Sequence, residues 1–472
     1  MKRILLSLWI ASLATFGCKA QPQGPVYEPV RFEDGTPVTG EAEADSLFAK
    51  DRFLVDTTST DKGDTVLVFR HASAFVRMQL DGLPADAGID RILLVPTEGK
   101  AMEIPVAIPG TGSPVVWMAK DPADLPATAA VVQAADGRYW SVRLPAIDLQ
   151  PGIAYRWTGT CLAPEALASD LTAMPQSQTL IDIEPGEYSG ITWLSGNRYA
   201  VVDDNLKGGG ILHFTIPIDS YGSIGSVSMR PADGTATADG KARDCEGIAF
   251  VPSLGTLYVS SEKQDIREYD LAGHATGKAF RIPADMGVGA IDDNRGFEAL
   301  SFNDVTGLFW TTTESPLKQD TFLPRILRLQ SFGVDGKPAE RFFYQTDEPM
   351  ASSAGATAYV FGVPAITALD DGRLLVLERE VFVPKGGFWD KLTGAFTKTT
   401  LYLVDPVHDT AGILRKARLC SFRTRALDLA NFEGMCLGPS LADGRRCLVL
   451  IADSQKGSGG LTNEYVKVIL LQ

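Results

Sequence analysis

The amino-acid sequence predicts an all-β protein in which an N-terminal β-sandwich is followed by a β-propeller. Short runs of β-branched and aromatic residues alternate with turn sequences along most of the chain. Gly (46) and Pro (28) are plentiful, which suits many short strands joined by turns. A two-strand motif also recurs in the C-terminal two-thirds, and 472 residues are enough for two or three domains.

The first residues are typical of an exported protein. Lys2 and Arg3 precede an apolar run that ends at Phe16, which predicts a signal peptide over residues 1–17. The run is too short to cross a membrane comfortably, and no later segment is long and apolar enough to do so. The sequence therefore predicts a protein that acts outside the cytoplasm.

The pair Gly17–Cys18 resembles a bacterial lipobox, in which the cysteine becomes the lipidated first residue after cleavage. We therefore expect a lipoprotein of the outer membrane that faces either the periplasm or the cell surface, held there only by the lipid on Cys18. Ordinary secretion with cleavage near Ala20 is the alternative. Residues 18–45 are rich in Gln, Pro, Gly and Glu and are expected to form a flexible tether.

Residues 46–160 are expected to form the β-sandwich. Thr65–Arg70 and Phe75–Leu80 have the composition of strands, and turn signals separate the strand-like runs. The segment Leu149–Tyr155 resembles the fimbrillin-like domains of Bacteroidetes surface proteins. Because no constellation of catalytic residues occurs here, a spacer or binding module is expected. Residues 161–176 are interpreted as a linker.

A repeated motif predicts the propeller over residues 177–472. Each copy begins with a small or acidic residue, continues through an apolar strand and a turn, and ends a second strand on a carboxylate. The copies are Ser189–Asp203, Glu246–Glu262, Glu298–Glu314 and Glu433–Asp453, with a fifth, Ile366–Glu378, that lacks the opening acid. Copies start roughly 50–70 residues apart, which is enough for a four-stranded blade and a loop. Five blades are expected, or six if segments 345–362 and 381–399 hide another.

The two ends of the propeller are predicted to meet. Only one further strand, Tyr465–Leu471, follows the last copy, and Gln178–Ile183 before the first copy can supply the missing strand. Such an exchange leaves no open sheet edge, which favours a closed propeller over an open sandwich.

The repeated carboxylates are expected to converge at one mouth of the central channel. In an antiparallel pair, the start of one strand lies beside the end of the next. Such crowding is unfavourable unless a cation neutralises it, and Ca²⁺ accepts carboxylate oxygens readily. The expected Ca²⁺ ligands are Asp203, Glu246, Glu378, Glu433 and Asp453, and the expected catalytic carboxylates are Glu262, Glu298 and Glu314. The structural alternative is that these acids only cap turns.

Basic residues between these acids suit a small anionic substrate such as a phosphate ester. Those expected to bind it are Arg243, Lys263, Arg295 and Arg379. A net charge of −14 without a basic run makes nucleic acid an unlikely partner. The chain has no Gly-x-Ser-x-Gly elbow, His-Glu-x-x-His motif or P-loop, and its four histidines lie outside the repeats.

An ordered set of short motifs resembles the phytase-like family, which is described as having esterase-like phytase activity. The motifs are Asp244–Ala249, Ser260–Glu262, Asn294–Leu300, Thr313–Ser315, Leu375–Arg379, Asn431–Gly434 and Ala452–Ser454. The resemblance covers about residues 180–472 and implies a secreted β-propeller with a hydrolytic site. Its matching positions are Glu246, Glu262, Glu298, Glu314, Glu378, Arg379, Glu433 and Asp453.

The leading hypothesis is a metal-dependent hydrolase of phosphate esters that works outside the cytoplasm. A lactone or ester hydrolase with a calcium propeller is one alternative, and a non-catalytic surface protein that binds a glycan or a protein is another. The five cysteines after Cys18 cannot all pair with one another. Cys436 and Cys447 could face each other across two strands, and buried free thiols are the other interpretation.

Overall fold

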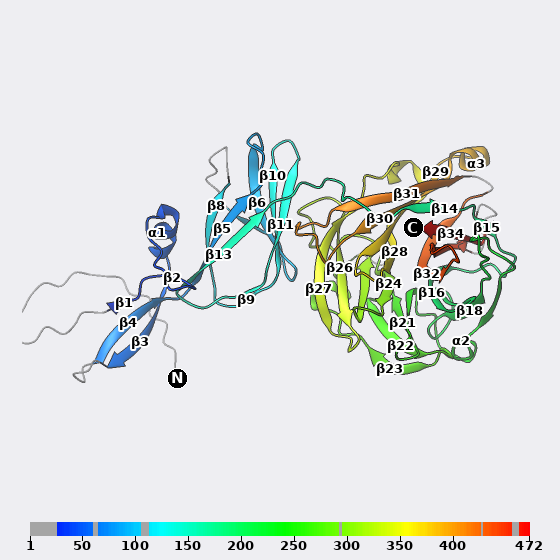
Figure 1. Cartoon of the computed structure of the whole chain (residues 1–472), viewed down its shortest axis with the longest axis horizontal. Helices are drawn as coiled ribbons and strands as arrows, with labels where there is room; N and C mark the ends of the chain where they lie inside the picture. The colour runs from blue at the N-terminus through cyan, green and yellow to red at the C-terminus, as the bar shows by residue number, and fades with distance from the viewer. Residues whose placement is uncertain (1–25, 60–64, 105–112, 292–294, 426–427, 456–461) are drawn as a thin grey trace, which may run out of the picture. The chain divides into compact units, whose positions relative to one another are not determined.

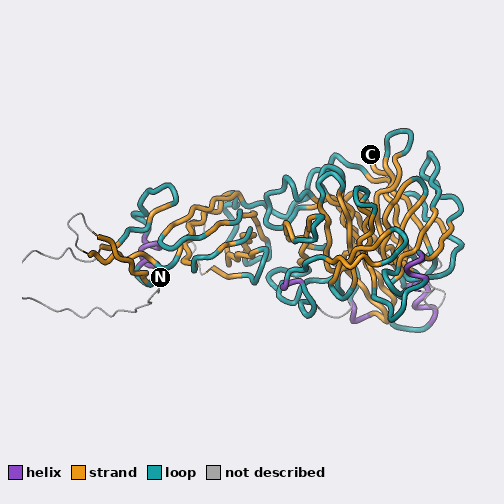
Figure 2. Tube along the Cα trace, turned by 90° about the horizontal axis from the view of Figure 1, so that it is seen from below, coloured by secondary structure: helices purple, strands orange, loops and turns teal. Residues whose placement is uncertain are grey.

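The computed structural model describes residues 26–59, 65–104, 113–291, 295–425, 428–455 and 462–472. The predicted signal peptide, Cys18 and Asn294 lie outside these residues. The chain divides into two compact units, one containing residues up to 163 with 410–412 and the other containing 164–409 and 413–472. Strands make up most of both units and helices are short, so the prediction of an all-β fold is confirmed (Figure 2). No helix in the described ranges has the length and apolarity to cross a membrane.

The first unit is a β-sandwich with an added hairpin. Its sheets have the orders β2-β13-β5-β8, β11-β10-β6-β7, β1-β4-β3 and β12-β9 (Figure 1). The two four-stranded sheets enclose a core that includes Met78, Leu94 and Trp140. The elements are β1 (Val26–Tyr27), β2 (Arg31–Phe32), α1 (Ala42–Phe48), β3 (Phe53–Ser59), β4 (Thr65–His71), β5 (Ala74–Asp81), β6 (Ile89–Pro96), β7 (Met102–Ile104), β8 (Val115–Lys120), β9 (Asp124–Leu125), β10 (Thr128–Ala134), β11 (Tyr139–Leu144), β12 (Ile147–Asp148) and β13 (Ile153–Thr160).

The prediction of a flexible tether over residues 18–45 is wrong for residues 26–45. Phe32 is buried in a small cluster with Trp117. The Glu41 carboxylate accepts hydrogen bonds from Arg77 Nε and Trp117 Nε1, each at 2.9 Å. Proline and glycine in short strands and turns give the same composition as a linker, so composition alone misidentified this segment.

The second unit contains five sheets among its described residues, which we number as blades 1 to 5 (Figure 1). Blade 1 has β16 (Tyr188–Ser195), β17 (Arg198–Asp203), β18 (Ile211–Thr215) and β19 (Ser228–Pro231). Blade 2 has β20 (Cys245–Val251), β21 (Thr256–Ser261), β22 (Asp265–Asp270) and β23 (Ala275–Ala279). Blade 3 has β24 (Phe297–Asn303), β25 (Leu308–Thr313), β26 (Ile326–Gly333) and β27 (Pro338–Gln345).

The last two blades differ in how they are assembled. Blade 4 has β28 (Ala356–Ala368), β29 (Leu374–Pro384), β30 (Phe396–Val404) and β31 (Lys416–Arg425). Blade 5 has β32 (Asn431–Ser440), β33 (Arg446–Asp453), β34 (Tyr465–Leu471) and, from before blade 1, β14 (Ala173–Pro175) and β15 (Thr179–Leu180). The short helices are α2 (Asp233–Ala236), η1 (Ala284–Met286), η2 (Ser353–Gly355) and α3 (Phe388–Gly394).

The five innermost strands contact one another in cyclic order: β16 with β20, β20 with β24, β24 with β28, β28 with β32, and β32 with β16. An apolar cluster also fills each interface between neighbouring blades. For example, Ile211 of blade 1 packs with Leu257 of blade 2, and Tyr199 of blade 1 packs with Val449 of blade 5. Burial between successive sheets therefore holds the ring together.

The start of the closing strand needs correction. The closing strand starts inside the predicted linker, because Ala173 pairs with Leu471 and Thr179 pairs with Val466. Segments 345–362 and 381–399 form no separate sheet in the described part of this unit, since they contribute mainly to β28, β29, α3 and β30 of blade 4.

The two cysteines that could have faced each other across two strands do not form a disulfide. Cys436 and Cys447 are free thiols.

Candidate functional site

The innermost strand of every blade carries a bulge at the same place, close to one end of the channel. Pairing shifts between Tyr188 and Gly190, Cys245 and Ile248, Phe297 and Ala299, Gly362 and Ala365, and Phe432 and Gly434. In four blades the residue displaced at this bulge is the small or acidic residue that opens the repeated motif. A bulge changes the direction of a side chain locally, which explains how the opening residues reach the channel.

The same strands arrange the channel in three layers, as the residues that line its free spaces indicate. The opening residues Ser189, Glu246, Glu298 and Glu433, of which three are glutamates, form what we call the acidic layer. Two positions later stand Ile191, Ile248, Leu300 and Met435, joined by Ile366 of blade 4, and all five are buried. Two positions further stand Trp193, Phe250, Phe302 and Leu437, which line a cavity of about 400 Å³ at the other end. Where acidic and aliphatic residues meet, the free space is only about 10 Å³, so the aliphatic layer closes the channel.

Glycine lets the inner strands approach closely beside the acidic layer. A Cβ atom on Gly190 would lie 2.3 Å from the Glu246 carbonyl oxygen, and one on Gly247 would lie 2.5 Å from the Leu300 nitrogen. In three blades the opening residue, which is Ser189, Glu246 or Glu433, is therefore followed by a glycine that lets the backbones approach.

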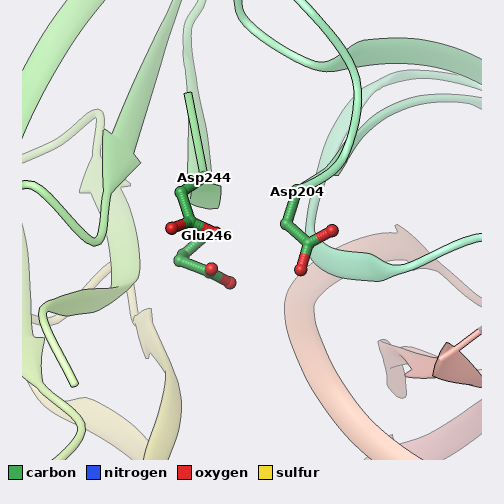
Figure 3. Close-up of side chains that lie close together, drawn as sticks. All are labelled: Asp204, Asp244 and Glu246. Carbon is green, nitrogen blue, oxygen red and sulfur yellow. The ribbon is translucent and has the colours of Figure 1, made fainter. Parts of the chain in front are cut away.

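Carboxylates from several blades meet at the acidic mouth. One oxygen each from Glu246, Glu262 and Glu298 lie within 4.8 Å of one another. Asp204, Asp244 and Glu246 form a second such group (Figure 3), so Glu246 belongs to both. Oxygen donors in this arrangement are suited to a hard divalent cation.

Burial dominates the electrostatics of this cluster. It raises the pKa of Glu298 and Glu246 well above the usual range, with further contributions from neighbouring carboxylates that include Glu433. Burial, with help from Glu187, also raises the pKa of Asp204 to about 9. Burial and the charge of Glu433 also raise the pKa of Asp453. Without a cation, several of these groups therefore hold protons at neutral pH.

Glu262 and Glu298 are joined by a hydrogen bond, and burial raises the pKa of both. Glu262 also accepts a hydrogen bond from the Gly296 nitrogen at 2.6 Å. Nearby Arg295 donates to the Ser315 hydroxyl at 2.9 Å, and its charge favours ionisation of Glu262 and Glu314. This side of the mouth thus offers a proton-carrying acid pair and a partly exposed guanidinium group.

Arg379 is buried in the cluster and is occupied by protein partners. Its guanidinium group donates to Glu433, to Glu314 Oε1 at 2.5 Å and to Asn431 Oδ1 at 2.9 Å, and Nε is buried without a partner. Asn431 in turn donates to Glu433 Oε1 at 2.9 Å. Because its donors are taken up by the protein, Arg379 acts as a counter-charge that positions two carboxylates, and not as the substrate-binding residue that the sequence predicted.

The structure does not bring four other expected residues into the cluster. Glu378 accepts hydrogen bonds from Tyr344 at 2.6 Å and Lys416 at 2.7 Å, away from the channel. Asp203 accepts from the backbone nitrogens of Glu187 and Asn205, each at 3.1 Å. Arg243 pairs with Asp265 and Tyr269, and Lys263 is exposed. Asp203 matches the structural alternative, in which strand-end acids only cap turns, because it accepts from backbone nitrogens. Glu378 differs from that alternative, since two of its partners are the side chains of Tyr344 and Lys416.

Asp204 and Asp244 are site residues that the sequence-based assignment missed. Asp204 directly follows Asp203, so the repeated motif was assigned to the wrong member of the pair. Asp244 precedes Glu246 by two positions, and that spacing could have identified it. Its backbone has a φ of 60°, an unfavourable conformation for a residue with a side chain that recurs at functional sites.

Comparison with known proteins agrees with this architecture. Residues 183–455, more than half of the chain, match the phytase-like family, described as esterase-like activity of phytase. The match contains all five inner strands and the whole carboxylate cluster. A search of curated proteins finds no match. Together with the ordered motifs, the match shows that this chain belongs to the phytase-like family.

Proposed function

We propose that this protein is a divalent-metal-dependent hydrolase of phosphate esters that works outside the cytoplasm. The observation that carries the proposal is the buried carboxylate cluster around Glu246, in which two groups of oxygens lie within 4.8 Å. Membership of a family described by esterase-like phytase activity supports hydrolysis. The substrate class, the metal and the location are our inference.

The donor set favours Ca²⁺. All the candidate ligand atoms are carboxylate oxygens, with no histidine or thiol among the groups that the structure places together. Glu246, Glu262 and Glu298 would hold one ion, and Asp204 and Asp244 are the further candidates. A bound cation would polarise a phosphoryl oxygen and make a bound water more acidic.

The chain's own residues have separable tasks in this proposal. Arg295 is partly exposed beside Glu262 and binds the phosphate oxygens. A carboxylate of the Glu262 and Glu298 pair accepts the proton of the attacking water and then passes that proton to the departing alcohol oxygen. Arg379 holds the Glu314 and Glu433 carboxylates in place through its hydrogen bonds, and its charge opposes the rise in the pKa of Glu314. The closed aliphatic layer excludes bulk water from below, which strengthens these interactions.

The test is phosphate release from phytate and p-nitrophenyl phosphate, after EDTA treatment and again after Ca²⁺ is restored. We expect activity only with the cation, and a loss in kcat/KM of about 100-fold or more in Glu298→Gln. The matched control is Glu340→Gln on the exposed part of β27, which should retain activity. Absence of cation-dependent release from both substrates would reject the proposal and leave two candidates, an ester hydrolase and a non-catalytic surface protein that binds a glycan or protein.

A carboxylic-ester or lactone hydrolase is the second candidate, favoured by the words esterase-like in the family description. The same cation and acid pair could act on a carbonyl group. A panel of lactones and p-nitrophenyl esters distinguishes the two, because ester turnover without phosphate release selects this candidate.

We also propose export and lipid attachment at Cys18. The test is metabolic labelling with a fatty-acid analogue in the wild type and in Cys18→Ala. Label and membrane association that persist in the variant would exclude Cys18 as the anchor.

A further inference from the structure

A small cavity of about 190 Å³ lies on blade 1 and is separate from the carboxylate cluster. Strands β17, β18 and β19 line it with Arg198, His213, Thr215, Ser228 and Arg230, among others. Arg198 begins β17, whereas the acidic mouth lies beyond the other end of that strand. The cavity is thus at the opposite end of the blade from the proposed hydrolytic site.

Strand register explains why these side chains meet. Arg198 pairs with Thr215, which pairs with Ser228 on the next strand. His213, two positions before Thr215, pairs with Arg230. Since positions two apart share a face and directly paired residues do too, all five lie on the same side of the sheet.

The donors around this cavity are not used by the protein. Arg198, Thr215, Ser228 and Arg230 are exposed at the opening of the cavity. Within the described residues, neither arginine forms an ion pair or a hydrogen bond through its side chain, and neither hydroxyl group has a hydrogen-bond partner. Most other arginines in this part of the chain contact a carboxylate, as Arg243 and Arg328 do. Two unpaired guanidinium groups beside one cavity, in a chain of net charge −14, indicate a place for a negative ligand.

The surroundings of His213 agree with a cavity suited to a negative ligand. Burial lowers its pKa, and the charges of Arg230 and Arg198 lower it further. A hydrogen bond to the Leu271 carbonyl and the charge of Asp233 act in the opposite direction. Burial is the largest cause of this lowered pKa, and the two arginines add to it, so the imidazole lies within their positive field.

We propose that this cavity binds a tetrahedral oxyanion, namely the phosphate or sulfate group of a ligand. Guanidinium groups match such oxygens with paired donors, and the two hydroxyl groups supply further hydrogen bonds. The volume fits one such group with part of its attached ligand. The site would give the propeller a second contact with a charged ligand, independent of hydrolysis at the acidic mouth.

The experiment follows the histidine ring signals of the intact protein by ¹H–¹⁵N NMR, with His213→Asn to assign the His213 signals. Inorganic phosphate and inorganic sulfate are titrated separately, against sodium chloride at the same ionic strength. We expect saturable movement of the His213 signals and an increase in its pKa of about one unit with the bound anion. Arg198→Gln/Arg230→Gln should weaken binding at least roughly tenfold.

Controls separate this site from the acidic mouth. Arg418→Gln, a change of an exposed arginine on blade 4, should leave the titration unchanged. Glu298→Gln should also leave it unchanged, since it alters only the proposed hydrolytic site. The proposal is overturned if neither anion moves the His213 signals beyond the chloride control, or if the double variant responds as the wild type does.

Discussion

Replacing Arg379 with methionine should destabilise the propeller strongly, although it removes only one charge. Arg379 is fully enclosed and donates to Glu314 and Glu433. Methionine has a similar length and fills the space, but it leaves two buried carboxylates without their counter-charge. Removing one partner from a buried ion pair typically costs about 3–5 kcal/mol, so we expect a loss of that size in the free energy of unfolding.

The loss of stability in this variant should depend on pH. Burial raises the pKa of Glu314, and Arg379 opposes this effect. Without Arg379 the folded-state pKa rises further above the unfolded value, so the folded protein holds protons that the unfolded chain releases. The stability of the variant therefore falls as pH rises above the unfolded value, and the loss should be smaller near pH 5 than near pH 8.

The assay is urea unfolding of the EDTA-treated protein followed by circular dichroism, at both pH values. Arg418→Met, on an exposed part of blade 4, is the matched control and should change stability by less than about 0.5 kcal/mol. Arg379→Met/Glu433→Gln should recover part of the loss, because one of the uncompensated charges is gone. A loss of less than about 1 kcal/mol near pH 8 in Arg379→Met would refute our view of the cluster as charge-balanced by this arginine.

Three further outcomes are expected. Ca²⁺ affinity measured by calorimetry should rise with pH, with proton release on binding, because the raised pKa values, including about 9 for Asp204, keep carboxyls protonated in the absence of the cation; an affinity independent of pH would contradict this. Glu246→Gln should weaken Ca²⁺ binding about tenfold or more, whereas Glu378→Gln should mainly lower the melting temperature, since Glu378 is held by Lys416 and not by the cluster; equal effects on affinity would refute the assignment. Gly190→Ala should cost about 2 kcal/mol or more in thermal unfolding because of the 2.3 Å approach to the Glu246 carbonyl, while Gly355→Ala, with open space around it, should be near neutral.

The fold could be predicted because each blade repeats the same local rules. Apolar strands, turn residues and a carboxylate at fixed offsets identified the blades without any knowledge of tertiary contacts. The closing strand was placed too late because β14 is short and starts at Ala173, in a stretch whose composition resembles a linker. The ordered segment around Phe32 was missed for the same reason, since its burial depends on Trp117, far along the chain.

The site could be predicted only in part, since strand-end acids can face either of two directions. The opening acids Glu246, Glu298 and Glu433 sit at bulges and enter the channel. Where a carboxylate at the end of a second strand lies depends on the partners that neighbouring blades supply. The spacing of residues along the sequence does not identify these partners. Glu378 meets Lys416 and Tyr344 in the interface between blades and is withdrawn from the channel. Local pattern therefore identifies a candidate, while tertiary partners decide whether it is free to bind.

The layered channel explains how one end can tolerate so much negative charge. A carboxylate cluster open to water on both sides would be solvated, and its members would ionise near their usual pKa. Here the ring from Ile191 to Met435 closes the channel below the acids, so Glu298 and Glu246 are desolvated and hold protons unless a cation replaces them. Because acid and aliphatic residue stand two positions apart in the same strand, the repeat that places the charge also builds the barrier that makes it reactive. Opening the barrier with Ile191→Ala should therefore bring the pKa of Glu298 closer to its ordinary value without changing any ligand of the proposed cation. If this substitution leaves the pH profile of hydrolysis unaltered, the aliphatic layer does not raise the pKa of Glu298 and has no part in the mechanism.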